Sequence, residues 1–330
     1  MLQIRNNTRF AASMALFPNE DAVDTLYVMV KASFNFDKAI TLANEQSPLV
    51  AADVYWTEPG KSSLKYASDM HTGKPSTDIV MLGHACPPGQ KETREMDVSL
   101  SVGKVSKSAR VYGDRQWKDG KITAPTAFKT MAMVYEKAYG GLYIQEGQIA
   151  DADTRNPVGR GFAGKRSSKD MNGVPLPNLE DPSRLIQKHD DQPAVAGFGF
   201  CAPNWQPRVS HAGTYDEYWK TNRAPYLPED FDSRFLNMAH PDLVYPGFAQ
   251  GGELVSIQGM HPRGSLEFEI PQVGLVTRVQ MADTEYLPLL NLETIILEPN
   301  ALRISMVWRA ALPCDKKALK VSEIKINLTS

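Results

Sequence analysis

The fold is decided by a stretch of the chain, from Tyr135 to Asp242, that contains YEKAYGG (135–141), NPVGRGF (156–162), GVPLPNLEDP (173–182), PAVAGFGFCAPNWQPR (193–208), GTYDEYW (213–219) and LPEDFDSRF (227–235). Glycine, proline and aromatic residues dominate it. Because glycine permits positive φ and proline fixes φ and removes a hydrogen-bond donor, long helices and strands are not expected here. Such a composition is typical of a linker or a disordered segment.

The same stretch holds many large apolar side chains, which argue against disorder: Phe162, Leu185, Ile186, Phe198, Phe200, Trp205, Tyr215, Tyr218, Trp219, Phe231, Phe235 and Leu236. Burying one such side chain stabilises a protein by about 1.5–3 kcal/mol. We therefore predict an ordered, loop-rich region in which these side chains pack onto a scaffold formed by both ends of the chain.

The segments on either side of this centre have the composition of β-strands. Before it, β-branched and aromatic residues with partial alternation predict strands at 25–36, 79–85, 98–102, 110–113 and 132–135. The strands at 98–102 and 110–113 are expected to form a hairpin around a Lys/Ser turn. After the centre, strands are predicted at 254–258, 266–270, 275–281, 294–297 and 302–310, with an edge strand at 319–328. The turn at 298–301 predicts that 294–297 and 302–310 pair.

Three short helices are predicted inside the centre. Asp181-Pro182 has the residues of a helix start, which predicts one or two turns over 183–188. Thr214-x-x-Glu217 fits a capping box for a helix through Trp219 that ends before Pro225. Asp230 or Asp232 is expected to cap a third helix through Phe235 and Met238, which Pro241 ends.

These elements indicate a mainly β fold, α+β at most, with strand-rich N- and C-terminal parts around the Gly/Pro/aromatic centre. We predict one domain over residues 1–330. Its sub-regions are a β-rich part (1–135), the loop-rich centre (136–246) and a second β-rich part (247–330). Two β-rich lobes bridged by the centre are the alternative.

Composition narrows the class of protein. The formal net charge of −2 argues against a nucleic-acid partner, which requires a basic surface. The three cysteines, Cys86, Cys201 and Cys314, are sparse and odd in number, which favours reduced thiols over a disulfide framework. The N-terminus lacks the apolar core of a signal peptide, and no apolar run approaches the ~18 residues of a membrane span. We predict a soluble cytoplasmic protein that binds neither membranes nor nucleic acids.

Motifs for catalysis or for metal binding are incomplete. Gly60-Lys61-Ser62 lacks the earlier glycine of a phosphate-binding loop, because Tyr55 stands there. His84-x-Cys86 has no second ligand pair for zinc, and Asp151-x-Asp153 lacks the glycine and the glutamate of a calcium loop. Cys201 with His211 as its base is a candidate nucleophile, although a buried thiol is the favoured interpretation. We therefore assign no catalytic residue, metal or cofactor.

Acidic and basic residues in this sequence offer many possible ion pairs. Asp69, Asp78, Asp114, Asp216, Asp230 and Asp232 are candidate partners for Arg115, Arg160, Arg208 and Arg234. In an irregular core such pairs most often hold loops together, because the five donors of an arginine can satisfy several loop carbonyls at once. A catalytic role for one of the pairs is the less favoured interpretation.

A series of short blocks along the chain resembles a known bacterial family. In order they are Val30-Lys31-Ala32-x-Phe34, Ser68-Asp69 with Lys74-Pro75-x-Thr77-Asp78, Gly83-x-Ala85, Val111-x-Gly113-Asp114-Arg115-x-Trp117, Tyr135-Glu136-x-Ala138-x-Gly140-Gly141, Asn156-Pro157-x-Gly159-Arg160-Gly161-Phe162, Leu176-Pro177-Asn178-x-Glu180, Gly197-Phe198, Trp205-x-Pro207-Arg208, Gly213-Thr214-Tyr215-Asp216, Trp219, and Leu227-Pro228-x-Asp230-Phe231-Asp232. Together they resemble the domain-of-unknown-function family 2169, whose members occur as adaptors, or chaperones, of type VI secretion effectors. The resemblance extends to about Leu297.

This resemblance implies a function. A member is expected to bind a toxic effector, often through its PAAR-type or adjacent N-terminal region, and to deliver it to the VgrG spike. The expected partners are therefore the PAAR-containing or toxin protein encoded nearby and possibly VgrG. Trp, Tyr and Arg anchor interfaces most often, and binding residues concentrate on loops held by a scaffold. We predict a non-enzymatic adaptor whose partner-binding residues are Trp205, Arg208, Tyr215, Asp216, Trp219, Asp230 and Phe231.

Two other functions remain open. The first is a hydrolase or metal-dependent enzyme that uses the Arg, Asp and His residues of the centre. The second is a structural part of the secretion machine, which would bind the spike without any effector.

Overall fold

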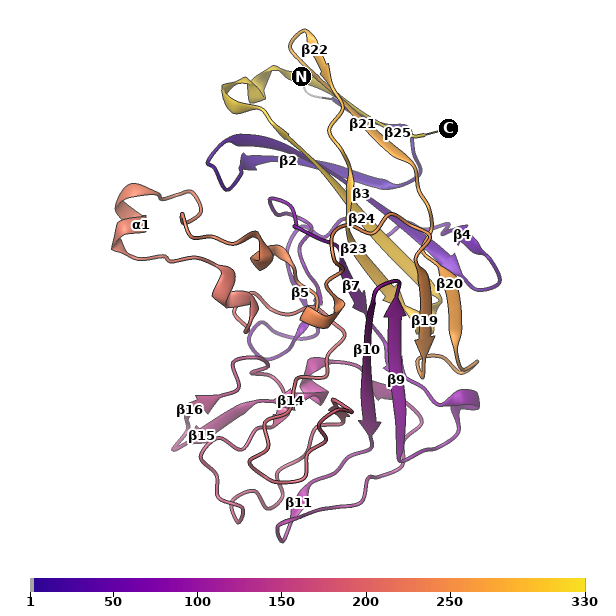
Figure 1. Cartoon of the computed structure of the whole chain (residues 1–330), viewed down its shortest axis with the longest axis vertical. Helices are drawn as coiled ribbons and strands as arrows, with labels where there is room; N and C mark the ends of the chain where they lie inside the picture. Colours follow the sequence, from indigo (N-terminus) through magenta and orange to yellow (C-terminus); the bar gives the residue numbers. More distant parts are fainter. Residues whose placement is uncertain (1–2, 330) are drawn as a thin grey trace.

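The computed structural model describes residues 3–329 and is strand-rich, as predicted (Figure 1). Its largest sheet joins both ends of the chain, in the order β2 (Ala11–Pro18), β3 (Asp24–Phe36), β24 (Arg303–Pro313), β23 (Asn291–Glu298) and β7 (Asp78–Met81), with β4 (Ile40–Leu42) paired to β3. Only the β23–β7 pair is parallel. β3 is buried on both faces, which explains why its sequence is a nearly continuous apolar run.

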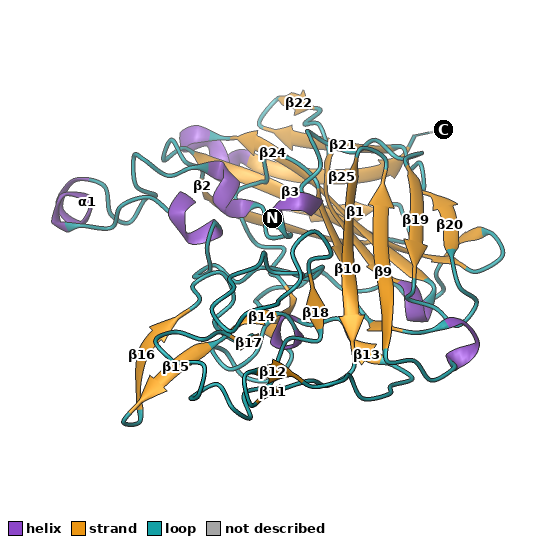
Figure 2. Ribbon diagram, turned by 60° about the horizontal axis from the view of Figure 1, so that its bottom comes forward, coloured by secondary structure: helices purple, strands orange, loops and turns teal. Residues whose placement is uncertain are grey.

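Two further sheets flank the largest one (Figure 2). The first has the order β18 (Leu179–Glu180), β10 (Val105–Tyr112), β9 (Glu95–Val102), β19 (Leu254–Gln258) and β20 (Leu266–Glu269). The second has the order β1 (Gln3–Asn6), β25 (Val321–Leu328), β21 (Leu275–Met281) and β22 (Thr284–Tyr286). Each sheet combines strands from distant parts of the sequence, so the two termini are built into the same scaffold.

The remaining elements are short and are joined by long loops, both in the centre and in the N-terminal part that precedes it. Two-stranded pairs are formed by β5 (Val54–Tyr55) with β6 (Leu64–Tyr66), β8 (His84–Ala85) with β13 (Met131–Ala132), β11 (Trp117–Lys118) with β12 (Lys121–Ile122), β14 (Tyr139–Gly140) with β17 (Arg160–Gly161), and β15 (Leu142–Gln145) with β16 (Gln148–Ala152). The α-helix α1 spans Glu217–Asn222. The 3₁₀ turns are Pro88–Gln90, Tyr135–Lys137, Arg208–His211, Ser233–Leu236, Pro241–Leu243, Pro299–Ala301 and Asp315–Lys320.

Of the twelve large apolar side chains of the centre that were predicted to be buried, five are buried, five are half-buried and two are exposed. Phe198, Phe200 and Trp205 are at most 3% exposed and join the main hydrophobic core, which also includes residues of all three large sheets. Trp117, Tyr139, Ala163, Met171, Leu176 and Ile186 form a second, smaller core under the loops. The expectation of burial is wrong for Tyr215 and Tyr218, which are 51% and 60% exposed.

The predicted helix over 183–188 does not form. Asp181 accepts hydrogen bonds from the amide and hydroxyl of Ser183, so its carboxylate closes a turn rather than capping a helix. The carboxylate of Glu180 accepts a hydrogen bond from the amide of Ile186 at 2.8 Å. The carboxylate of Asp191 accepts hydrogen bonds from the amides of Gln187 and Lys188. Side-chain carboxylates therefore satisfy the amides that a helix would have bonded internally.

Several predicted strands have different limits or places. The run 79–85 is divided into β7 and β8, and the segment 132–135 contains only the end of β13 before the 3₁₀ turn at Tyr135. The β9–β10 hairpin is confirmed, but its turn is at Gly103, where φ is +51°, and the Lys/Ser stretch belongs to β10. The β23–β24 hairpin is confirmed. β25 is not an edge strand, because β1 pairs with it on the side opposite β21.

Candidate functional site

The most prominent feature of the surface is a projecting arm, residues 213–232, which carries α1 at its far end and extends away from the sheets in both views (Figures 1 and 2). The segments that enter and leave the arm are joined at its base by two hydrogen bonds. The amide and the hydroxyl of Thr214 donate to the carboxylate of Asp230 at 2.9 and 2.7 Å. Gly213 enters the arm with φ +80°, and a Cβ there would lie 2.9 Å from Cβ of Pro228. A glycine is therefore required where the two loops approach each other.

The far end of the arm is held by local hydrogen bonds. Asp216 is the N-cap of α1 and accepts the amide of Trp219 at 2.9 Å. The predicted capping box is thus wrong, since the N-cap lies two residues after Thr214, but the helix passes through Trp219 and ends before Pro225 as predicted. The indole of Trp219 donates to the carbonyl of Tyr226 at 2.8 Å and packs edge-to-face on Tyr215, with ring centroids 4.7 Å apart. These contacts fix the arm in shape although its helix has fewer than two turns.

An apolar groove lies between the arm and the end of β2, with a volume of about 450 Å³. Phe17 and Pro18 at the end of β2 line one side of it. The arm contributes Tyr215, Pro225, Tyr226, Leu227 and Phe231, and the following 3₁₀ turn contributes Phe235 and Leu236. Arg223 fastens the arm across this groove, because its guanidinium donates to the carbonyl of Glu20 at 2.6 Å. The groove is therefore bounded by segments about 200 residues apart in the sequence.

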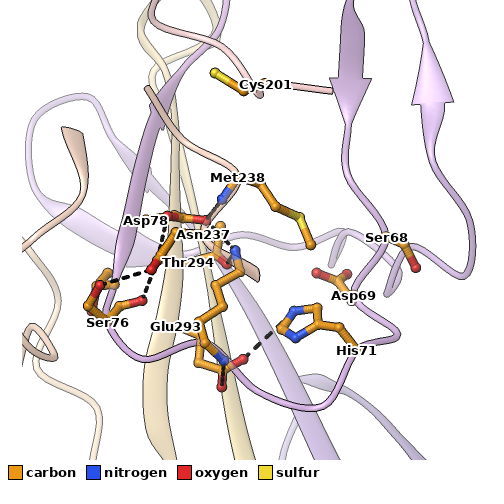
Figure 3. A network of polar contacts seen from close by, with 12 residues as sticks. Ser68, Asp69, His71, Ser76, Asp78, Cys201, Asn237, Met238, Glu293 and Thr294 are labelled. Carbon is orange, nitrogen blue, oxygen red and sulfur yellow. Dashed lines mark hydrogen bonds and ion pairs between the residues drawn. The ribbon is translucent and has the colours of Figure 1, made fainter. Parts of the chain in front are cut away.

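A buried network of charged residues includes His71, which also lines the groove. Figure 3 shows part of this network. Arg309 of β24 donates from Nε to Glu293 of β23 at 2.8 Å and from Nη2 to the carbonyl of Asp69 at 2.5 Å. The ring Nε2 of His71 is 3.0 Å from the same Nη2. Burial lowers the pKa of His71 well below its ordinary range, and the Arg309 charge acts in the same direction. His71 therefore adds no positive charge to the groove near neutral pH.

Asp78 connects this network to the chain that leaves the arm. Its carboxylate is completely buried and accepts from Nζ of Lys74 at 2.6 Å, from the amide of Met238 at 2.7 Å and from Nδ2 of Asn237 at 2.9 Å. Lys74 also donates to the hydroxyl of Thr294 at 2.7 Å. The end of the 3₁₀ turn that follows the arm, Ser233–Leu236, is thus fixed to the strands β7 and β23.

The seven residues predicted to bind a partner occupy two different environments. Tyr215, Asp216 and Asp230 are exposed, and Trp219 and Phe231 are half-buried in the arm and groove. Trp205 and Arg208 lie inside the protein. Trp205 packs edge-to-face on Tyr135, and Arg208 donates to the carbonyls of Phe235 and Cys201, at 2.8 Å each. These two buried residues can influence a partner only through the position of the loops that they hold.

The prediction that arginines hold loops together is confirmed for three of the four named. Besides Arg208, Arg115 bonds the carbonyl of Pro177 and pairs with Glu180, and Arg160 donates to the carbonyl of Glu136 at 2.9 Å. Arg234 differs, because it is exposed and pairs with Asp232 two residues away. Asp232 is also the cap of the turn Ser233–Leu236, which ends before Met238 and is shorter than predicted.

The candidate nucleophile Cys201 is not arranged as one. Its thiol is buried with Sγ 3.2 Å from the hydroxyl of Tyr135, and burial raises its pKa to about 11. A catalytic thiol requires the opposite shift. His211 instead lies 3.4 Å from Asp232. Among residues 3–329, no cluster of three or more His, Cys, Asp or Glu side chains is placed to hold a metal ion, and no helix in that range is long and apolar enough to cross a membrane.

The model of a family described as an uncharacterized protein conserved in bacteria (DUF2169) matches residues 21–309. The chain belongs to this family. The DUF2169 match includes the whole arm and the residues of the buried network, but it begins after Phe17 and Pro18 of the groove. No curated protein and no solved structure matches the chain.

Reasoning from sequence named five residues of the arm as candidate binding residues, but it did not predict the arm itself or most of what surrounds it. The sequence indicates Asp78 as a candidate ion-pair partner of an arginine, whereas its partner is Lys74, and it gives no sign of the roles of Glu293, Arg309 and Phe17. A signal for Asp78 did exist, because a carboxylate directly before the apolar run 79–85 marks a charge at the start of a buried strand. Lys74 lies only four residues before Asp78, but the other partners of that carboxylate, Asn237 and Met238, are about 160 residues further along the chain, and no local pattern identifies them.

Proposed function

We propose that this DUF2169 protein is a non-enzymatic adaptor that binds a type VI secretion effector and helps to load it onto the VgrG spike. The contact on the effector is its PAAR-type domain or the adjacent N-terminal region, and binding takes place in the cytoplasm before secretion. The choice of this partner rests on the family resemblance of the sequence. The single structural observation that supports a binding function is the projecting arm with its exposed aromatic residues.

The arm has the properties of a binding element rather than of a flexible loop. Tyr215 and Tyr218 are more than half exposed, and large exposed aromatic side chains favour a protein–protein contact. The Thr214–Asp230, Trp219–Tyr226 and Arg223–Glu20 hydrogen bonds hold the backbone around them. A surface that is already ordered loses less conformational entropy when it binds.

Co-purification tests the proposal directly. The tagged chain is expressed with the PAAR-containing or toxin protein encoded next to it, and the two are expected to elute together in size exclusion at fixed stoichiometry. Tyr218→Ala removes a side chain that is 60% exposed, so it is expected to leave the melting temperature unchanged and to weaken the complex at least about tenfold. Leu289→Ala, at a position 76% exposed on another surface, is the matched control.

Three results would overturn the adaptor. The first is a lone peak for the chain beside every neighbouring effector, and the second is stable binding to VgrG without effector, which would indicate a structural part of the spike. The third is stoichiometric metal in the purified protein, or esterase, phosphatase or nuclease turnover that a substitution in the centre abolishes. If Tyr218→Ala and Leu289→Ala bind the effector equally well, the adaptor stands but its contact is not the arm.

A further inference from the structure

The two segments that border the apolar groove have a charge unlike that of the rest of the chain. Residues 19–24 and 213–232 together contain eight acidic and two basic residues, a net charge of −6, whereas the whole chain has a net charge of −2. The remainder is therefore positive by four charges. The negative charge of the molecule is concentrated beside the groove, on the β2–β3 turn and on the arm.

Few of these carboxylates are neutralised inside the molecule. Lys220 pairs with Glu217 on α1, and Arg223 donates to the carbonyls of Glu20 and Leu227. Arg234, just outside the arm, pairs with Asp232. The side chains of Glu20, Asp21 and Glu229 are exposed and make no hydrogen bond or ion pair with any residue of the described range 3–329. We call these three residues the acidic rim.

The interior of the groove has the opposite character. Phe17, Pro18, Tyr226, Leu227 and Phe235 line it with apolar surface, and His71 at its floor is neutral. An apolar groove with an acidic rim complements a segment that presents apolar side chains flanked by positive charges. A second copy of this chain in a symmetric dimer is disfavoured, because it would bring two acidic rims together.

We propose that the groove and the acidic rim bind a basic amphipathic segment of the partner protein, with its apolar side chains in the groove and its Lys or Arg residues at Glu20, Asp21 and Glu229. This inference deepens the proposed function and rests on it for the identity of the partner. It adds the chemistry of the contact, which the family resemblance does not supply. It also predicts that ionic strength weakens the complex, since exposed charges are screened within about 8 Å at 0.15 M salt.

The test is a charge reversal with a matched control. The triple variant Glu20→Lys, Asp21→Lys and Glu229→Lys brings the net charge of the two segments from −6 to zero. The control reverses Glu92 and Asp283, two exposed acidic residues outside the groove and the arm. One probe is the neighbouring effector. The second is a synthetic 15-residue amphipathic peptide of Leu and Lys, compared with a peptide in which every Lys is Glu.

An exposed charge pair changes affinity by up to about fivefold, so three reversals are expected to weaken effector binding about ten- to a hundredfold at low salt. The control variant is expected to bind like the wild type, and the Lys peptide to bind better than the Glu peptide.

Equal effector binding by the triple variant and the wild type would overturn the inference while leaving the adaptor function intact. Binding of the Lys peptide that only the triple variant loses, with no effector captured, would support the groove chemistry and overturn the effector assignment. If the triple variant self-associates more strongly than the wild type, the inference would be overturned, because the groove would then bind a second copy of this chain.

Discussion

Replacing Asp78 by Asn tests whether the buried charge network fixes the base of the arm. The carboxylate is fully buried, and its contact with Lys74 at 2.6 Å is the ion pair of an ammonium that is only 2% exposed. Asparagine keeps the size and one acceptor oxygen but removes the negative charge. Breaking one side of a buried ion pair costs about 3–5 kcal/mol, because the other charge remains without a partner. We expect the free energy of unfolding to fall by that amount.

The double variant Lys74→Met, Asp78→Asn distinguishes an uncompensated charge from general damage. It removes the ammonium as well, so it is expected to recover at least about 2 kcal/mol relative to Asp78→Asn. Urea unfolding followed by tryptophan fluorescence and by circular dichroism measures both quantities, provided that the two transitions coincide. Asp283→Asn, at an exposed position, is the control.

The same variant reports on the arm through hydrogen exchange. The amide of Met238 donates to Asp78 at 2.7 Å, directly after the turn that follows the arm. We expect this amide to exchange faster in Asp78→Asn than in the wild type, beyond the change in global stability. A loss below about 1 kcal/mol, additive effects in the double variant, or unchanged Met238 protection would refute the reasoning that the network holds this part of the chain.

Three further predictions concern other buried groups. Arg208→Lys removes the guanidinium that bonds the carbonyls of Phe235 and Cys201, so chemical unfolding is expected to give a loss of about 2–3 kcal/mol, and a loss under 0.5 kcal/mol would contradict it. Burial lowers the pKa of His240 to about 4, so between pH 6.5 and 4 the unfolded chain binds a proton that the folded chain does not. His240 is therefore expected to contribute about 3 kcal/mol to the fall in stability from pH 8 to pH 4, in addition to the loss that His71 causes, and a His240→Gln profile as steep as that of the wild type would refute this source. Because Cys86, Cys201 and Cys314 are buried thiols, alkylation at pH 8 is expected only after addition of denaturant, and rapid labelling of the native protein would contradict their burial.

The sequence patterns that predicted the fold correctly are those in which burial and hydrogen bonding are local. β3 was predicted within one residue, because a strand buried on both faces leaves a long apolar run. The β23–β24 hairpin followed from the turn residues between its strands. The place of β25 was not predictable, because its partner β1 is about 320 residues away and a strand carries no mark of which distant strand pairs with it. The failed helix over 183–188 has a related cause, since acceptors outside its own backbone compete for its amides.

The exposed aromatic residues of the candidate site could not be predicted from the sequence either. Aromatic residues in GTYDEYW were expected to be buried, and the hydrophobic effect gives that expectation for any tyrosine or tryptophan considered alone. The indole of Trp219 donates a hydrogen bond to Tyr226 within the arm, but Tyr218, one residue away, is 60% exposed to solvent. The difference arises because α1 is too short to bury both of its faces, and the Thr214–Asp230 closure holds the arm away from the sheets. The fold itself thus leaves an apolar face uncovered beside a groove whose lining residues Asn19 and Leu227 are followed closely in sequence by Glu20, Asp21 and Glu229, and this arrangement supports the proposed binding function.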